Sequence, residues 1–581
     1  MMRLHLRRAG VTPNLTPSLL LGPLVWRASL LFTVLVSALF AARLAPGQEP
    51  KADASEDGAW SEVLEAGERY LRQGRREAAR TRFDEVLAGV DEAYEDDRPT
   101  AKERGRALLG KARIEGDYGR YDDAKALLEE ARRLEARPEL ELAASRIETR
   151  VGEYEAALRR LDALALGDSN TVHRIVALAE RGRLLRRLGR RADARRDFEA
   201  VVAANAAQNF DDAARKTALG IALCELGSPD QLYEASSLFI EVTKQDPLYV
   251  DAYLELGDLH FRVWREVAGR PSGESEYKRA LEHCGDHELV LVALYRTRKE
   301  NFLLESDKTD SYLRRALAIN KNSVPALVAR ASNLIDERRF GAARSVLQQA
   351  LSINARDVTA LSEMAAVCNL LYREADEKVF RERAAAVDPT SVEADALLGK
   401  HLIALYRFAD AIPILNRARA KDPEDVPTLL SLGRALLYAG RAEEGARLLE
   451  ETKKIERGFV NPWRDNQIAL QRRVDETYEK VEIGNFVFQI HPSEKDVLVP
   501  YLSREYEEAR KLLGTKYGVT PDCKVQVENF RRFGDFSVRT VGFKGFGALG
   551  ACFGCLITSV SPAAPELRSQ FSWKVTAWHE F

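Results

Sequence analysis

The chain has 581 residues, of which 45% are hydrophobic and 30% charged, and this excludes both a disordered chain and a bulk membrane protein. Its 87 Lys and Arg residues are balanced by 89 Asp and Glu, so the formal net charge is only -2. Nucleic-acid binding requires a basic surplus or stripe, so no nucleic-acid partner is expected. Six cysteines are too few to hold a chain of this length together by disulfides.

The amino terminus has the composition of an export signal or a membrane anchor. Three arginines within the first eight residues precede an uncharged apolar run, 28–42. This run suits the apolar core of a signal peptide and is shorter than the roughly 20 residues that span a bilayer. No clear Ala-x-Ala site follows, so cleavage and an uncleaved anchor both remain open. Residues 1–45 therefore predict an exported protein (periplasmic, extracellular or membrane-anchored), with residues 46–59 as a linker.

A step of 34 residues recurs through the middle of the sequence. It is marked by tripeptides that end in Asn or Asp, namely Ala318–Asn320, Ser352–Asn354, Ala386–Asp388 and Ala420–Asp422. Small residues recur at fixed offsets, in one column of Ala331, Ala365, Gly399 and Gly433 and a second of Ala350, Ala384, Ala418 and Thr452. Two short helices cannot bury their apolar face alone, so neighbouring units must stack.

Less regular units precede this region. Their first helices are marked by small residues at intervals of 34 to 43, namely Gly67, Gly110, Ala144, Gly182, Gly220 and Gly257. We expect ten or eleven units over 60–457, clearest over 324–457. The predicted fold class is mainly α, a solenoid followed by a small α+β domain, because a non-repetitive bundle does not produce consecutive equal steps.

The repeat resembles the tetratricopeptide repeat, whose small residues at positions eight, twenty and twenty-seven match Gly399, Ala411 and Ala418. Asp395 stands where that repeat usually has an aromatic residue. The resemblance implies a groove that binds a protein or peptide. Eight arginines assigned to second helices are interpreted either as a basic patch or as solvated helix faces. They are Arg159, Arg160, Arg186, Arg187, Arg190, Arg191, Arg195 and Arg196.

After the repeats the pattern changes from helical periodicity to alternation. We expect a connecting helix over 458–481 and a separate domain over 482–581. Within that domain the patterns predict a strand at 486–490, a helix at 494–517, strands at 524–530 and 554–559 around a glycine-rich passage, and a last helix capped by Ser572.

Three segments carry a second resemblance: Phe486–Pro492, the glycine-rich passage Gly547–Gly554, and Trp578–Phe581. Residues 482–581 resemble the amino-terminal part of the peptidase MA-like domain, a zinc metallopeptidase of the gluzincin type. The resemblance implies that His579 is the first ligand of H-E-x-x-H and that Glu580 activates a zinc-bound water. The second histidine would fall beyond residue 581, so zinc is expected only in a longer form.

Other motifs are less specific. His287-Glu288 is the same dipeptide, but Leu291 stands where a second histidine would be needed. Cys552 and Cys555 have C-x-x-C spacing without a second pair, so a disulfide and two half-buried thiols both remain open. The sequence thus predicts an exported repeat protein that binds polypeptides and carries an incomplete metallopeptidase-like domain, which would hydrolyse peptide bonds in a longer form. The alternative is a non-catalytic interaction scaffold.

Overall fold

The computed structural model describes residues 59–89, 98–166, 170–264, 273–299, 306–456, 459–567 and 572–581. The predicted signal or anchor, 1–45, and all but the last residue of the predicted linker lie outside this part. Among the described helices, none combines the length and the apolar character that crossing a membrane requires.

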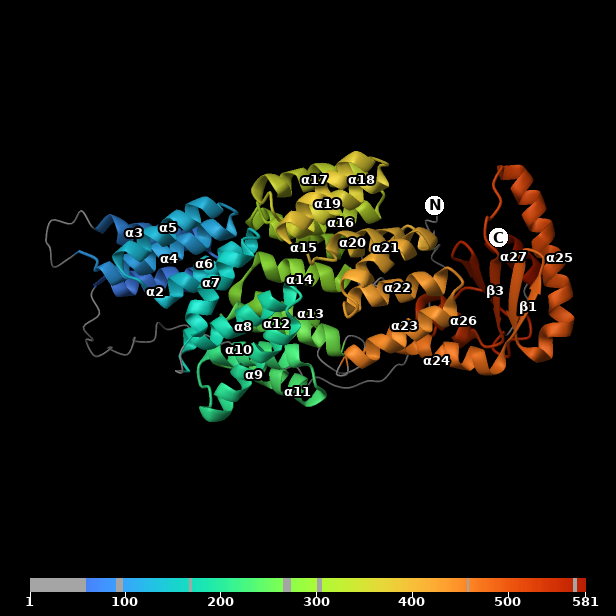
Figure 1. Cartoon of the computed structure of the whole chain (residues 1–581), viewed down its shortest axis with the longest axis horizontal. Coiled ribbons are helices and arrows are strands. Elements are labelled where there is room, and N and C mark those ends of the chain that lie inside the picture. Colours follow the sequence, from blue (N-terminus) through green and yellow to red (C-terminus); the bar gives the residue numbers. More distant parts are fainter. Residues whose placement is uncertain are drawn as a thin grey trace, which may run out of the picture. The chain divides into compact units, whose positions relative to one another are not determined.

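Eleven consecutive helix pairs form the described chain as far as Ile455 (Figure 1). They are α2 (Ala59–Arg72) and α3 (Arg76–Ala88), α4 (Ala101–Asp117) and α5 (Tyr121–Leu134), α6 (Pro138–Arg150) and α7 (Tyr154–Ala165), α8 (Val172–Arg187) and α9 (Arg191–Ala207), α10 (Ala213–Leu226) and α11 (Pro229–Gln245), α12 (Val250–Trp264) and α13 (Gly273–Cys284), α14 (Glu288–Lys299) and α15 (Ser306–Ile319), α16 (Val324–Asp336) and α17 (Phe340–Ile353), α18 (Val358–Leu370) and α19 (Glu374–Val387), α20 (Glu393–Ala404) and α21 (Phe408–Lys421), and α22 (Val426–Tyr438) and α23 (Ala442–Ile455). The sequence predicted ten or eleven such units.

Small residues on the first helices allow each pair to close. A Cβ added to Gly220 of α10 would lie 2.5 Å from a ring carbon of Phe239 on α11. One added to Gly399 of α20 would lie 2.5 Å from Leu415 on α21. Phe239 and Leu415 are both fully buried, so the bulk that fills each pair comes from the second helix. Gly220 and Gly399, two of the small residues that mark first helices in the sequence, therefore lie where the helices of a pair approach each other.

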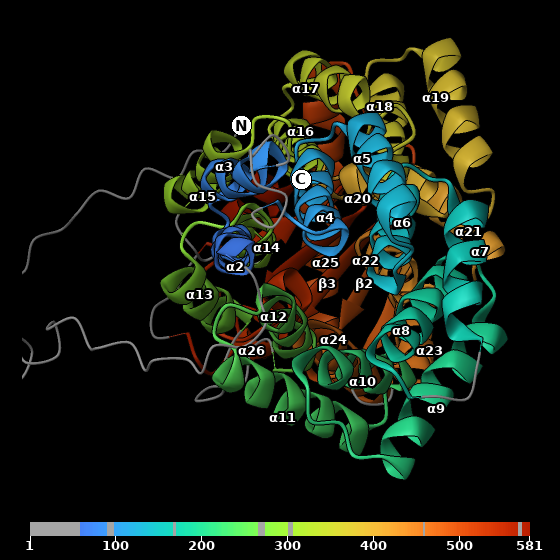
Figure 2. The same cartoon turned by 90° about the vertical axis from the view of Figure 1, so that its left-hand side faces the viewer.

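The solenoid winds so that distant units meet. Asn320 donates its side-chain amide to the carbonyl of Asp117 at 2.7 Å, and Asn354 does the same to Arg150 at 2.8 Å. The partners are 203 and 204 residues apart, and in both cases the end of one helix pair meets the pair five places earlier. One superhelical turn therefore comprises between five and six units. In the end-on view α8, α10 and α12 lie inside and α9, α11 and α13 outside (Figure 2).

The last repeat leads into α24 (Pro462–Thr477) and a five-stranded mixed sheet of order β1-β2-β3-β5-β4. Its elements are β1 (Glu479–Ile483), β2 (Phe486–Ile490), α25 (Pro492–Tyr517), β3 (Val525–Phe530), α26 (Phe533–Val541), β4 (Gly550–Cys552), β5 (Leu556–Val560) and α27 (Trp573–Glu580). Strands β2, β3 and β5 are parallel, whereas β1 and β4 pair antiparallel at the two edges.

The two faces of this sheet are covered by different helices. Phe486 and Phe488 pack with Tyr506 of α25 and Ala577 of α27 in one cluster. Phe530 packs with residues of α24 and α26 in another. Phe488 of β2 pairs in register with Val527 of β3. Because side chains alternate along a strand, Phe530 lies on the face opposite to that of Phe486 and Phe488.

The sequence patterns located three strands and missed three further elements. The predicted connecting helix, 458–481, ends at Thr477, and its last residues enter β1. The glycine-rich passage contains β4, and α26 occupies residues to which no element was assigned. The strand predicted at 554–559 begins at Leu556, because Phe553–Cys555 form the turn between β4 and β5. The prediction of Ser572 as a helix cap is confirmed, since its hydroxyl accepts the Val575 N–H.

Candidate functional site

The first superhelical turn encloses two adjoining cavities of about 430 and 470 Å³. The first is lined mainly by α2, α4, α6 and the start of α12, and the second by α4, α6, α8, α10 and α12. Five residues line both cavities: Arg113, Arg146, Arg150, Tyr249 and Asp251. We call this continuous space the inner channel.

Most arginines of the inner channel are held by carboxylates. Arg146 pairs with Glu180 at 2.5 Å, and Arg183 makes two hydrogen bonds to Glu255 at 2.7 and 2.6 Å. Arg113 has no hydrogen bond or ion pair within the described residues. The channel walls displace water from around its guanidinium, and this desolvation, together with the charge of Arg146, lowers the pKa of Arg113 from the usual value. A guanidinium without a carboxylate partner in a concave wall is a group to which an anion can bind.

Sequence patterns did not indicate the residues of the inner channel. Of the eight arginines predicted to lie on second helices, Arg186 and Arg187 belong instead to the first helix α8, and seven of the eight have carboxylate partners. These seven are Arg160, Arg186, Arg187, Arg190, Arg191, Arg195 and Arg196. The patch is therefore a set of paired charges, which supports the solvated-face interpretation. Arg113 lies between Ala112 and Ile114, but α4 contains several other charged residues, so no sequence pattern singles Arg113 out.

The predicted zinc ligand and general base lie at the end of α27. His579 is exposed, and Glu580 is half-buried with its side chain against Gly550 of β4. Burial raises the pKa of Glu580, and neighbouring His579 partly opposes this. No cluster of three or more potential ligands (His, Cys, Asp or Glu) occurs in the part of the chain that the structure describes. The described residues thus do not complete a zinc site, and the roles of His579 and Glu580 stay predictions.

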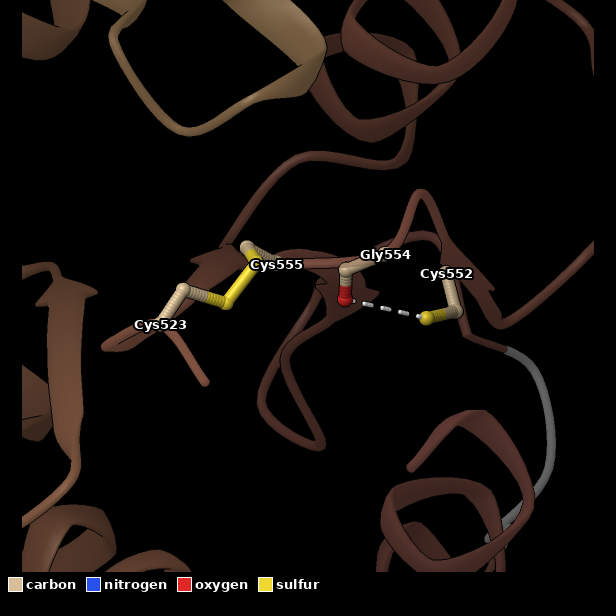
Figure 3. The surroundings of a disulfide bond; sticks show 4 residues. All are labelled: Cys523, Cys552, Gly554 and Cys555. Atoms are coloured by element: carbon tan, nitrogen blue, oxygen red, sulfur yellow. Dashed lines mark hydrogen bonds between the residues drawn. A yellow bond between two sulfur atoms is a disulfide. The ribbon is translucent and has the colours of Figure 1, made fainter. Parts of the chain in front are cut away.

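The cysteine pair of the glycine-rich passage is not internally bonded. Cys555 forms a disulfide with Cys523, which precedes β3, and Cys552 keeps a thiol directed at the Gly554 carbonyl (Figure 3). Spacing could not reveal this pairing, because Cys523 is brought to Cys555 by the parallel pairing of β3 with β5. Burial raises the pKa of the Cys552 thiol, which makes it a weak nucleophile.

The disulfide lies next to the contact between the sheet and the last repeats. Phe553, in the turn between β4 and β5, stacks on Tyr438 of α22 with ring centroids 4.5 Å apart. The Tyr438 hydroxyl donates to the Thr540 carbonyl at 3.2 Å. Arg539 of α26 is completely buried and donates to Glu528 of β3 at 2.7 Å. The sheet region is therefore packed against the end of the solenoid as a folded cap.

Two buried histidines have partners that resemble catalytic arrangements. His260 bonds Ser236 at 2.9 Å and lies 3.8 Å from Glu276. All three side chains are at most 5% exposed, so no substrate reaches them. Burial and the charge of Arg279 lower the pKa of His260 to about 4. This group is a packed core contact rather than a nucleophilic site.

The other buried histidine, His401, joins three first helices of the second turn. Its ring nitrogens bond Glu363 at 2.7 Å and Asp336 at 3.0 Å. Burial alone would lower the pKa of His401, but the two carboxylates outweigh it and raise the pKa to about 9. The imidazolium thus links α16, α18 and α20.

This network predicts a pH-dependent stability. A group whose pKa is higher in the folded state stabilises most below its unfolded value, about 6.5, and loses that contribution as pH rises through about 9. We expect the free energy of unfolding to fall over this window by at most about 3 kcal/mol. Urea unfolding between pH 6 and 10 measures it. His401→Gln should flatten the dependence, and an equally steep fall in that variant would assign it to other groups.

A match to a family model supports the assignment of the repeat. Residues 402–463 match the family model of the tetratricopeptide repeat. No curated protein matches the chain. Among solved structures, yeast Tom70 is 14% identical, with 72% of this chain and 89% of that chain covered and a TM-score of 0.32. A human IFIT1 dimer with PPP-AAAA is 15% identical, with coverages of 62% and 86% and a TM-score of 0.34.

The Cut9–Hcn1 hetero-tetramer of the APC/C is 14% identical, with coverages of 70% and 82% and a TM-score of 0.37. Similarity at these scores says nothing about ligands, so we draw no functional argument from it. The chain carries a tetratricopeptide repeat at residues 402–463, set within a solenoid of eleven helix pairs.

Proposed function

We propose that the protein is an interaction scaffold that binds an extended polypeptide segment in the inner channel. The observation that carries this is the pair of adjoining cavities that share Arg113, Arg146, Arg150, Tyr249 and Asp251. Apolar side chains from the first helices alternate there with paired charges, which suits a ligand that has both side chains and a polar backbone. Stacked repeats create extended binding surfaces of this kind.

The test is selection of peptides from a displayed random library on the full-length protein, followed by affinity measurement with a fluorescent selected peptide. We expect Arg113→Glu to weaken binding about tenfold or more, because it reverses the charge of a side chain that lines both cavities and has no ion pair among the described residues. Arg195→Glu is the matched control, since Arg195 lies on a second helix outside the channel and is 67% exposed. Equal affinities for all three proteins would contradict the proposal.

A zinc peptidase is the second candidate. It is favoured by the position of α27, where a Cβ added to Gly550 would lie 2.7 Å from Cγ of Glu580. Strand β4 is at an edge of the sheet, and such an edge can hold an extended peptide beside this carboxylate. Metal analysis of the full chain and of His579→Ala tests the site. Stoichiometric zinc in the first and none in the second would support it, and equally low contents would contradict it for this chain.

We also propose that the protein is exported, as its first 45 residues predict. The Cys523–Cys555 disulfide supports this, because disulfides persist mainly in oxidising compartments. Thiol titration of denatured protein from its native compartment should then find four free cysteines of the six. Six free thiols would indicate a reducing compartment.

A further inference from the structure

The charged side chains that line the inner channel are almost all neutralised by ion pairs. Arg150, for example, lies 3.2 Å from Asp117, and the other pairs are of the same kind. Two charged lining residues, Arg113 and Asp251, form no ion pair and no hydrogen bond within the part of the chain that the structure describes. The channel therefore presents one unpaired charge of each sign.

These two residues lie where the two cavities join, since both line both cavities. Arg113 is on α4, and Asp251 is in the first turn of α12, so the winding of the solenoid brings them to one space. Both side chains are exposed to solvent. A carboxylate in the first turn of a helix favours the helix through its dipole, but the oxygens of Asp251 can still accept hydrogen bonds from a ligand.

The charge of Asp251 acts on the arginines of the channel without forming an ion pair with them. Desolvation and the charge of Arg146 lower the pKa of Arg113, and the charge of Asp251 partly opposes this. Glu180 chiefly raises the pKa of Arg146, and Asp251 adds to that effect. Such interactions require the charges to lie near each other. A ligand that presents an anion to Arg113 and a cation to Asp251 can therefore pair with both at once.

We propose that the inner channel selects a polypeptide segment in which an acidic and a basic side chain lie close together, the acidic one bound to Arg113 and the basic one to Asp251. The selection rests on the proposed function, because the channel must first bind a polypeptide, and it specifies the chemistry of that ligand. Leu109 and Ile147 line the first cavity and Ile221 the second, where they would contact apolar side chains on either side of the two charges.

A segment with charges of only one sign fits this space less well. A wholly acidic segment would bring a like charge to Asp251, and a wholly basic one would bring a like charge to Arg113, beside Arg146. Like charges in contact lower affinity and exclude wrong partners. Because the two unpaired charges come from different helices, they also fix which way round the acidic and basic side chains bind.

Reciprocal charge reversal tests the selection on the full-length protein. The probe is a peptide selected from the displayed library, with its amino terminus acetylated and its carboxyl terminus amidated so that neither end carries a charge. Arg113→Glu should weaken its binding by about tenfold or more, and changing the acidic residue of the peptide to lysine should restore binding to that variant. Asp251→Lys should likewise be restored only when the basic residue of the peptide becomes glutamate.

A double exchange separates pairing from general electrostatic attraction. Arg113→Asp with Asp251→Arg leaves the net charge of the channel unchanged, so general attraction predicts no change in preference. Specific pairing predicts that this variant prefers, by about tenfold, the peptide whose acidic and basic residues are exchanged. Asp251→Asn removes the charge and keeps the size of the side chain. Weaker binding by this variant with an unchanged thermal midpoint would assign the loss to the charge rather than to folding.

Asp211→Lys is the matched control, because Asp211 is 87% exposed and lines neither cavity; it should bind the probe as the unaltered protein does. If no displayed peptide binds the full-length protein, the proposed function fails and the selection with it. If Arg113→Glu loses binding and no reversal in the peptide restores it, the proposed function stands and the selection is overturned. Selected peptides that lack either an acidic or a basic residue would overturn it equally.

Discussion

Replacing Arg539 with methionine should destabilise the cap by about 3–5 kcal/mol, the usual cost of removing one partner from a buried ion pair. Arg539 is completely buried, and Glu528 is 4% exposed, so the remaining carboxylate would be left unpaired in the interior. The guanidinium also donates to Gln471 of α24 at 2.6 Å. The variant should therefore destabilise both the sheet, through Glu528, and the contact between the sheet and α24, through Gln471.

Urea unfolding followed by tryptophan fluorescence measures this effect, because Trp463, Trp573 and Trp578 report on the cap. The double variant Arg539→Met with Glu528→Leu is the control. Removing both charges spares the cost of an unpaired buried carboxylate, so it should recover much of the loss. If the single and double variants unfold alike, the ion pair is not what holds the cap.

Phe239→Ala should lower the free energy of unfolding of the solenoid by about 3–5 kcal/mol, because it leaves a cavity at a fully buried site. The loss should spread beyond one unit, because the cluster that contains Phe239 extends from Leu142 to Val263 and includes Phe459. Circular dichroism during thermal unfolding should show a lower midpoint for the helical signal as a whole.

Gly220 allows a matched test of this site. A Cβ added there would lie 2.5 Å from the Phe239 ring, so Gly220→Leu alone should overpack the pair and cost about 1–3 kcal/mol. Combined with Phe239→Ala, the leucine occupies part of the vacated space, and the double variant should be more stable than Phe239→Ala alone. Strict additivity of the two losses would mean that the residues do not share one packing site.

The candidate sites could be predicted from the sequence only in part. The His579-Glu580 dipeptide was visible as a motif, yet its roles depend on groups that the described residues do not supply. Arg113 could not be selected from the many arginines, because an unpaired charge is defined by the carboxylates that fold near it. The state of Cys552 and Cys555 was open for the same reason, because it depends on a residue that the fold brings near. That residue is Cys523, which forms the disulfide with Cys555.

Local pattern determined the elements of this protein. The 34-residue step, the small residues facing Phe239 and Leu415, the alternation at 486–490 and the cap at Ser572 are each encoded within one or two helices or strands. Short-range periodicity suffices for these, because helix and strand geometry fixes which residues share a face.

Only the tertiary structure decided what the recurring Asn and Asp residues do. The sequence marked Asn320 and Asn354 as the ends of repeats, whereas the fold shows them bonded to Asp117 and Arg150 in the preceding turn. Each unit adds a small rotation, and the contact between residues 204 apart in sequence depends on the sum of five such rotations. No single unit encodes that sum, so the contacts between turns and the inner channel appear only when the stacked repeats are seen together.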